Sequence, residues 1–254
     1  MESQRKSVQS FFDRLAPNYR QRYEGKQPFL KYLHEERLEK AVDGLDLSGK
    51  TVLDIGAGTG ILYDHLLRAR VHTREGFAYY SCDISEAMLA ESRIPPDRRW
   101  VGTPRECSFP VPSFDAIFLL GVTTYLTKAE LEDMLDFIAT HRSPGGMAVL
   151  SFSNRESWDF QFRRFVAPLL PKRLLRKTVL GQAFPFRGYS VREVWEMLPD
   201  GVGIEKVVWM NATAFPFSRI FPGASVRLSK WVLGLRLPDW ILRKICGDFL
   251  LKIS

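Results

Sequence analysis

The sequence predicts an α/β protein with a doubly wound, Rossmann-like sheet of about seven strands. A strand-like run at residues 51–55 breaks into a glycine-rich turn and then a helical segment. Strand-like and helix-like segments alternate through residues 50–153, as expected for a parallel sheet covered on both faces. With 254 residues, 45% of them hydrophobic, the chain can bury one large core.

Residues 1–49 are predicted to be helical. An amphipathic segment at 10–16 is expected to end at Pro17, because proline cannot continue the hydrogen bonding of a helix. Residues 30–42 carry apolar side chains at helical spacing with charges between them, which predicts a surface helix packed through one face.

The stretch 51–60, TVLDIGAGTG, combines an apolar run with three glycines. Its apolar run is typical of a parallel strand covered on both faces. Gly56, Gly58 and Gly60 allow backbone angles closed to other residues and let a ligand approach the main chain. The helix predicted at 61–70 would present its first N–H groups to whatever occupies the turn.

The following segments continue the alternation. They are a strand at 77–83 ending in Asp83, a helix at 86–92 opened by Ser85, strands at 99–102 and 114–121, a helix at 128–141 and a strand at 147–153.

The second half is less regular. Residues 155–189 are aromatic, basic and broken by prolines, and read as an insert. A capping box at Ser190 and Glu193 opens a helix to about residue 198. Further segments are predicted as a sixth strand at 204–210, a helical insert of two short helices at 218–246 split at Pro238, and a final strand at 249–253 that pairs with the sixth. We expect one domain over 1–254, with parts 1–49, 50–154, 155–189 and 190–254.

Composition excludes several classes. The N-terminus is charged and lacks an apolar core, so no secretory signal is expected, and no long uncharged apolar run predicts a membrane span. The three cysteines have no metal-ligand spacing, which favours a reducing, cytoplasmic setting and no metal site.

The net charge of +7 is unevenly placed. Residues 155–181 hold seven Lys and Arg against two acids, and residues 218–254 also hold seven against two. Each segment is therefore +5, which indicates an acidic partner without naming it.

The glycine turn has an acid before it, in the order Asp54, Gly56, Gly58, Gly60. A dinucleotide-binding turn prefers Gly-x-Gly-x-x-Gly, so this spacing disfavours a nicotinamide-dependent dehydrogenase. A carboxylate at Asp54 disfavours a bound phosphate but can hold an ammonium group, directly or through water.

Taken with Asp83, VLDIGAGTG resembles the first motif of the class I methyltransferases, which use S-adenosylmethionine. PSFDAIFLLGVTTYL and SPGGMAVLSFSN resemble the fourth- and fifth-strand motifs, so the resemblance covers about residues 49–154. It implies that Asp83 accepts hydrogen bonds from the ribose hydroxyls and that Ile84 and Met88 pack against adenine. The implied cofactor-binding residues are Tyr19, Asp54, Gly56, Ala57, Gly58, Gly60, Asp83, Ile84, Met88, Thr103 and Leu120.

FFDRLAPNY resembles the N-terminal element that closes over the cofactor in the ubiquinone-biosynthesis-like branch. Residues 1–49 are thus expected to be a helical lid with Tyr19 facing the site. Thr103 stands where the family often has an acid near the adenine amino group, and it or its backbone is the expected substitute. Tyr125 stands where many relatives have a histidine, and it is the candidate general base. The histidines themselves are expected to face solvent: His34, His65, His72 and His141.

The resemblance implies methyl transfer from S-adenosylmethionine to a small molecule, with oxygen on a saccharide, lipid-linked or natural-product intermediate as the favoured target. One alternative is a catalytically inactive binding or scaffold protein that kept the pocket. Another is a peripheral-membrane methyltransferase of quinone or tetrapyrrole biosynthesis.

The basic segments 155–181 and 218–246 interleave Lys and Arg with Trp, Phe and Leu. Three interpretations stay open: a membrane interface, a site for an anionic or lipid-linked acceptor, and a helical cap whose charges are solvated. Nucleic acid is not expected, because no RNA-binding signature is present. The first interpretation would place the protein peripherally at the inner face of a membrane.

Overall fold

The computed structural model describes residues 2–24, 28–69, 76–165 and 186–254. The strands are β1 (Thr51–Ile55), β2 (Ala78–Asp83), β3 (Arg99–Val101), β4 (Phe114–Leu119), β5 (Arg142–Ser153), β6 (Ile204–Met210) and β7 (Asp248–Ile253). The α-helices are α1 (Glu2–Glu24), α2 (Pro28–Val42), α3 (Ile61–Arg68), α4 (Glu86–Ala90), α5 (Lys128–His141), α6 (Trp158–Phe165), α8 (Val191–Trp195), α9 (Phe217–Ile220), α10 (Pro222–Gly234) and α11 (Asp239–Ile245).

The seven strands form one sheet in the order β3-β2-β1-β4-β5-β7-β6. Strands β1 to β5 pair in parallel, and β7 pairs antiparallel with both β5 and β6. The predicted fold class is confirmed, as is the pairing of the last strand with the sixth. The chain winds outward in both directions from β1 and β4, and a crevice opens where the strand order reverses.

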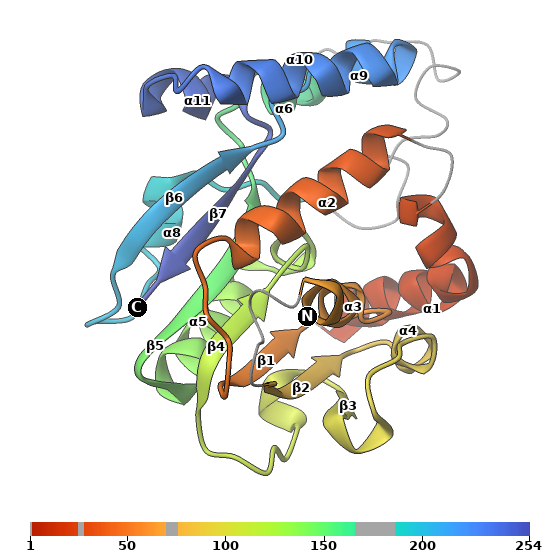
Figure 1. The fold of residues 1–254 in the computed structure, drawn as a ribbon, viewed down its shortest axis with the longest axis vertical. Helices are drawn as coiled ribbons and strands as arrows, with labels where there is room; N and C mark the ends of the chain where they lie inside the picture. Colours follow the sequence, from red (N-terminus) through yellow and green to blue (C-terminus); the bar gives the residue numbers. More distant parts are fainter. Residues whose placement is uncertain (1, 25–27, 70–75, 166–185) are drawn as a thin grey trace.

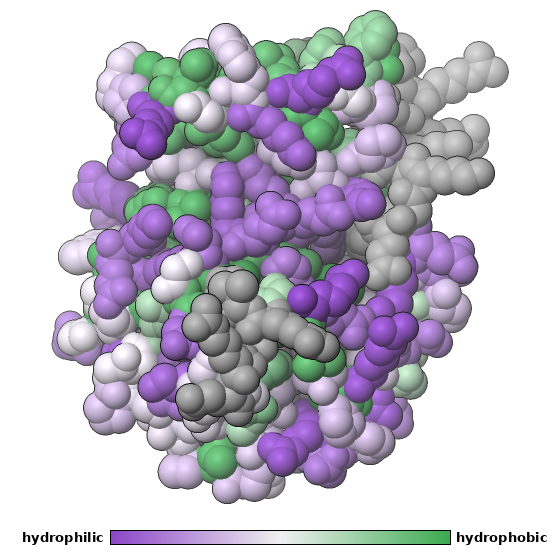
Figure 2. All heavy atoms as spheres, in the orientation of Figure 1, coloured by the Kyte–Doolittle hydropathy of each residue, from purple (hydrophilic) through white to green (hydrophobic). Residues whose placement is uncertain are grey.

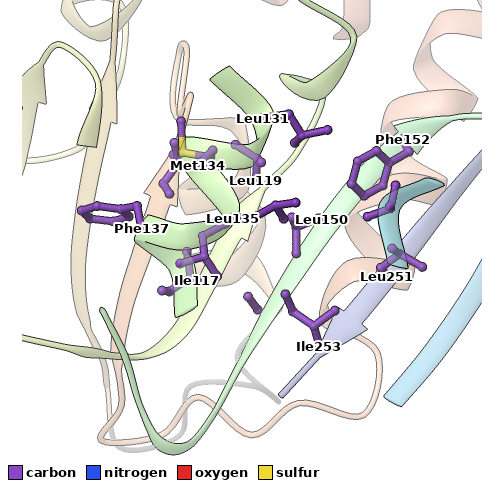
Figure 3. Close-up of a cluster of buried hydrophobic side chains, with 14 of the residues drawn as sticks. Ile117, Leu119, Leu131, Met134, Leu135, Phe137, Leu150, Phe152, Leu251 and Ile253 are labelled. Carbon is purple, nitrogen blue, oxygen red and sulfur yellow. The ribbon is translucent and has the colours of Figure 1, made fainter. Parts of the chain in front are cut away.

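Helices cover both faces of this sheet (Figure 1). The alternation of side chains along β4 shows the division, since Ile117 and Leu119 belong to the cluster under α5, whereas Ala116 and Phe118 belong to the cluster under α2 and α3. Figure 3 shows the first cluster, with side chains of α5 packed on those of β4, β5 and β7. Burial on both faces explains why these strands read as continuous apolar runs.

Several boundaries differ from the prediction, and three of the differences have a clear physical reason. Helix α1 continues through Pro17, because side-chain contacts described below fix it on either side of the proline. Strand β5 begins at Arg142 instead of Met147, since its early residues extend the pairing with Phe114. The 218–246 region holds three helices, with a break before Pro222 as well as at Pro238.

Part of the basic insert, residues 166–185, lies outside the described residues. No described helix combines the length and the apolar character that crossing a bilayer requires.

Candidate active site

A cavity of about 1430 Å³ opens at the carboxyl ends of the central strands. Its glycine-turn end is lined by residues 54–59, 83, 84, 88 and 102–105, at or after the ends of β1, β2 and β3. Its helical end is lined by residues of α2, α6, α9 and the start of β7. Because β4 and β5 separate β1 from β7 in the sheet, these two ends face different halves of the molecule.

The turn after β1 requires glycine at two positions. Gly56 has φ 74°, and a Cβ there would come within 2.2 Å of Val122 Cγ2. Gly58 has φ 53°, and a Cβ there would lie 3.2 Å from Met88 Cε. The turn can therefore pass close under the end of β4 and leave its backbone open to the cavity.

Asp83 ends β2 and lines the cavity. Its Oδ2 accepts a hydrogen bond from the Gly58 N–H at 2.8 Å and its Oδ1 one from the Ser85 N–H at 2.8 Å. Burial raises the pKa of this carboxyl to about 6, against the lowering effect of those two N–H groups. Each oxygen keeps a second lone pair for a ligand hydroxyl.

Asp54, the residue before the last in strand β1, is buried and also lines the cavity. Tyr79 donates its hydroxyl to Asp54 Oδ2 at 2.6 Å. Burial raises the pKa of Asp54 to about 7, the Tyr79 hydrogen bond lowers it, and the nearby charge of Asp83 raises it. A cation placed beside Asp54 would favour its ionised form.

The loop after β3 places Thr103 on the cavity wall. Both the backbone N–H and the hydroxyl of Thr103 donate to Glu106 Oε2, at 2.7 and 2.9 Å. Arg5 of α1 binds the same carboxylate at 2.8 and 2.6 Å and, with those bonds, lowers the pKa of Glu106 to about 2. Glu106 thus fixes the Thr103 loop from outside the cavity, and the T-x-x-E capping box was the sequence signal for this contact.

Helix α1 is fastened over the glycine-turn end. Asp13 accepts a hydrogen bond from the Ser85 hydroxyl at 2.6 Å, next to Asp83. Arg20 pairs with Asp64 of α3 at 2.5 Å and donates to the Thr59 carbonyl in the turn. These contacts lie before and after Pro17 and hold the helix through it.

An aromatic wall joins α1 to the end of β4. Phe12 lies edge-to-face with Tyr125, with ring centroids 5.2 Å apart, and its ring is 6.4 Å from that of Tyr19. Tyr19 in turn contacts the ring of His34 on α2 at 6.5 Å. Tyr19, His34 and Tyr125 all line the cavity, so the expectation that His34 faces solvent is wrong.

Two basic groups on α2 face the cavity near its middle. Burial, and then the Arg37 guanidinium, lower the pKa of His34 to about 3, so its imidazole is neutral at ordinary pH. A Cβ on Gly121, just beyond β4, would lie 2.9 Å from an Arg37 terminal nitrogen. Arg37 Nε is buried and has no hydrogen-bond partner among the described residues.

The helical end contains a partly buried acid, Asp248, at the start of β7. Ser153 donates to its Oδ1 at 3.0 Å and the Asn211 side chain to its Oδ2 at 2.8 Å. Burial raises the pKa of Asp248, and the Arg37 charge lowers it. Sequence reasoning missed Arg37 and Asp248, because residues so far apart in the chain meet only in the folded sheet.

The structure brings the candidate site residues named from the sequence around this one cavity, with one exception. Gly60 does not line it. It precedes α3 with φ 73°, and a Cβ there would meet Ser92 Cβ at 3.1 Å, so its role is to let α3 begin close to the α4 region.

Comparisons with known proteins agree with this geometry. A family profile described as "Methyltransferase domain" matches residues 53–148. The sheet superposes on magnesium protoporphyrin IX methyltransferase from Synechocystis PCC 6803 with bound S-adenosylhomocysteine, with TM-score 0.61, 16% identity and 98% of each chain covered. An S-adenosylmethionine-dependent methyltransferase from Archaeoglobus fulgidus gives TM-score 0.55 at 15% identity, with 92% of this chain and 97% of that one covered. Residues 53–148 thus match a methyltransferase-domain profile, and the sheet is the seven-stranded mixed sheet typical of class I S-adenosylmethionine-dependent methyltransferases.

The curated relatives match only part of this chain. The ribosomal protein L11 methyltransferases of Aeromonas salmonicida and Aeromonas hydrophila are 28% identical over 154 residues, which is 61% of this chain. The match spans 46% of their own length, about half. The solved structures share the fold. At 16% and 15% sequence identity they show nothing about this chain beyond the fold.

The residues present fit the methyl donor of this family. Asp83 offers two acceptor oxygens to vicinal hydroxyls, and Asp54 offers a carboxylate to an ammonium group. Thr59 also lines the cavity, and its buried hydroxyl has no hydrogen-bond partner among the described residues. Ile84, Met88 and Leu120 supply apolar wall for a purine.

Proposed function

We propose that this methyltransferase transfers a methyl group from S-adenosylmethionine to an oxygen of a small-molecule acceptor. When bound, the cofactor supplies a methyl group on a sulfonium, which is already a good leaving-group system. In this proposal Asp83 binds the ribose hydroxyls and Asp54 binds the ammonium group. Met88 and Ile84 hold the adenine, with Thr103 at its edge.

One observation carries the proposal. A single cavity connects Asp54, Asp83 and the open backbone of the glycine turn with a second, polar end beyond β4. That arrangement gives a donor and an acceptor separate places with a shared boundary near Gly121. Alignment of the two reactants supplies much of the rate enhancement in such a transfer.

Asp248 is our candidate for the general base when the acceptor must lose a proton. It is a partly buried carboxylate with a raised pKa, and it lines the helical end of the cavity. Tyr125 remains the second candidate, since it lines the boundary and packs on Phe12. His34 is the weaker base, because its pKa of about 3 leaves little proton affinity.

Arg37 is assigned to an anionic group of a bound molecule. Its guanidinium lies near Gly121, and its buried Nε has no hydrogen-bond partner among the described residues. The anion is either the methionyl carboxylate of the cofactor or a carboxylate or phosphate of the acceptor. Weaker S-adenosylhomocysteine binding by Arg37→Gln would select the first source, and unchanged binding the second.

The position of α1 supports placement in the ubiquinone-biosynthesis-like branch. Its FFDRLAPNY segment lies beside the cofactor end of the cavity, where Asp13 binds Ser85 and Tyr19 lines the wall. In this proposal the first helices act as a lid on the donor.

Calorimetric titration tests the proposal. S-adenosylhomocysteine should bind and NAD should not. Release of S-adenosylhomocysteine from S-adenosylmethionine is then screened against hydroxyl-, carboxylate- and phosphate-bearing small molecules. Failure to bind S-adenosylhomocysteine would overturn the proposal, whereas tight binding without release by any acceptor would favour the scaffold alternative.

A further inference from the structure

The helices α6, α9, α10 and α11 carry large apolar side chains on their solvent side. Figure 1 shows α9, α10 and α11 in a row along one edge of the molecule, with α6 behind them. We call their exposed aromatic and aliphatic side chains the outer face. It includes Trp158, Phe221, Leu228, Trp231, Leu235 and Trp240.

Helix α10 has the reverse of the usual surface pattern. Its buried positions are Ser225 and Ser229, which are 1% and 0% exposed, and Ser229 contacts the Tyr32 hydroxyl on α2 at 2.9 Å. The exposed large apolar side chains over α10 and its caps are Phe221, Leu228, Trp231 and Leu235. Their spacing of seven, three and four residues puts them along one side of the helix. Leu233 packs partly buried against the core, but the large apolar side chains of this stripe have no partner among the described residues that would remove them from solvent.

Charge surrounds this apolar stripe. Between residues 218 and 246 the sequence has six Lys and Arg and a single acid, Asp239. Arg227, Lys230 and Arg236 are exposed on or beside α10. Figure 2 shows apolar and hydrophilic residues interleaved along this edge.

We propose that the outer face is a docking surface for an anionic lipid bilayer. Trp, Phe and Leu side chains on one side of a helix enter the boundary between headgroups and acyl chains, while Lys and Arg reach the phosphate level. The positive charge of the segment complements anionic headgroups and opposes the approach of a second copy of the same face.

Two of the helices that carry the outer face also border the cavity. Phe160 and Arg163 of α6 and Ser218 of α9 line its helical end. We therefore expect docking to bring the acceptor end of the site near the lipid surface. This consequence rests on the proposed function, whereas the docking itself does not.

Vesicle co-sedimentation of the full chain tests the docking. We expect binding to phosphatidylglycerol vesicles at low salt, little binding to phosphatidylcholine vesicles, and weaker binding as salt is raised. The double variant Trp231→Ser and Trp240→Ser should bind at least about tenfold more weakly. The matched control is Trp195→Ser on α8, a Trp that is 58% exposed away from the outer face. It should bind like the parent.

A charge-reversed pair separates the electrostatic contribution. Arg227→Glu and Arg236→Glu should lose the preference for phosphatidylglycerol, and Arg192→Glu on α8 should keep it. Titration of every variant with S-adenosylhomocysteine reports folding and the donor site independently of lipid.

Three outcomes would overturn the proposal. The first is no binding of the parent chain to either vesicle at low salt. The second is equal loss of binding in the Trp195→Ser control. The third is a dimer by analytical ultracentrifugation that dissociates in the Trp231→Ser, Trp240→Ser variant, which would assign the outer face to a second copy.

Discussion

The two ends of the cavity are built in different ways. At the glycine-turn end, Asp54, Asp83 and the glycines lie at or just after the ends of two neighbouring parallel strands, which the sheet pairing brings together. At the helical end, Arg37, Asp248 and the residues of α6 and α9 come from distant parts of the chain. The residues of the glycine-turn end could be predicted from the sequence to lie together. Those of the helical end are brought together only by the folded structure.

This difference matches the demands of two kinds of ligand. A constant cofactor presents the same hydroxyls and ammonium group, so a short motif at the ends of parallel strands suffices to bind it. An acceptor varies between related enzymes, so its site is assembled from inserts and loops on a rigid scaffold. Substitutions at one end of the cavity should therefore leave the function of the other end largely unchanged.

The largest effect is expected from Asp83→Ala. It removes both acceptor oxygens for the ribose hydroxyls, and loss of two hydrogen bonds to a charged group weakens S-adenosylhomocysteine binding about 10³-fold. Calorimetry measures it, with the exposed Asp97→Ala as the matched control. Because Asp83 also accepts from Gly58 and Ser85, thermal unfolding must show a folded variant. Binding within threefold of the parent would disprove the assigned role.

Asp248→Asn tests the opposite end. The amide keeps the shape but cannot take a proton, so turnover of an acceptor that must lose a proton falls about 10²-fold or more. Binding of S-adenosylhomocysteine should stay within about twofold, since Asp248 lies at the helical end. Release of S-adenosylhomocysteine under saturating donor measures the change. Full turnover in Asp248→Asn with loss in Tyr125→Phe would transfer the role to Tyr125.

The pH dependence of donor binding is the next effect in size. A proton and the donor ammonium compete for Asp54, whose pKa is about 7, so affinity falls as the pH falls. Between pH 8 and pH 6, Asp54 accounts for about a tenfold loss and Asp83, with its pKa of about 6, for about twofold. The Asp54→Asn variant should retain only the twofold step. A flat profile in the parent would remove Asp54 from the ammonium site.

Removal of one contact that holds α1 over the glycine-turn end should have the smallest effect on donor binding. Asp13→Ala removes the hydrogen bond to Ser85 and leaves the Arg20–Asp64 ion pair, so S-adenosylhomocysteine binding weakens about fivefold. Glu35→Gln, at an exposed position of α2, is the control. A change in the dissociation rate with little change in the association rate is expected if α1 closes over the bound donor. No change in either rate would mean that α1 is only packed on the surface.

The sequence predicted the glycine-turn half well because its signals are local. An apolar strand, a turn that needs left-handed backbone and a helix follow one another within residues 51–68. The capping box at Ser190 likewise marked the start of α8. Such features depend on residues at most a few positions apart.

The remaining features depend on tertiary contacts. Pro17 predicted a helix end, but contacts of Asp13 and Arg20 with other elements outweigh the lost backbone hydrogen bond. The sequence predicted that His34 faces solvent, but α2 lies against the cavity and places His34 in its wall. Asp248 gave only a weak signal, an acid before the apolar run of β7.

The division of the cavity is tested most directly by a crystal structure of the protein with S-adenosylhomocysteine. Our account predicts both ribose hydroxyls within hydrogen-bond distance of the Asp83 carboxylate and the ammonium group beside Asp54. It also predicts the sulfur directed past Gly121 toward the end that contains Asp248. A ligand bound at the helical end, or one that leaves Asp83 in contact with Gly58 and Ser85 alone, would contradict the account.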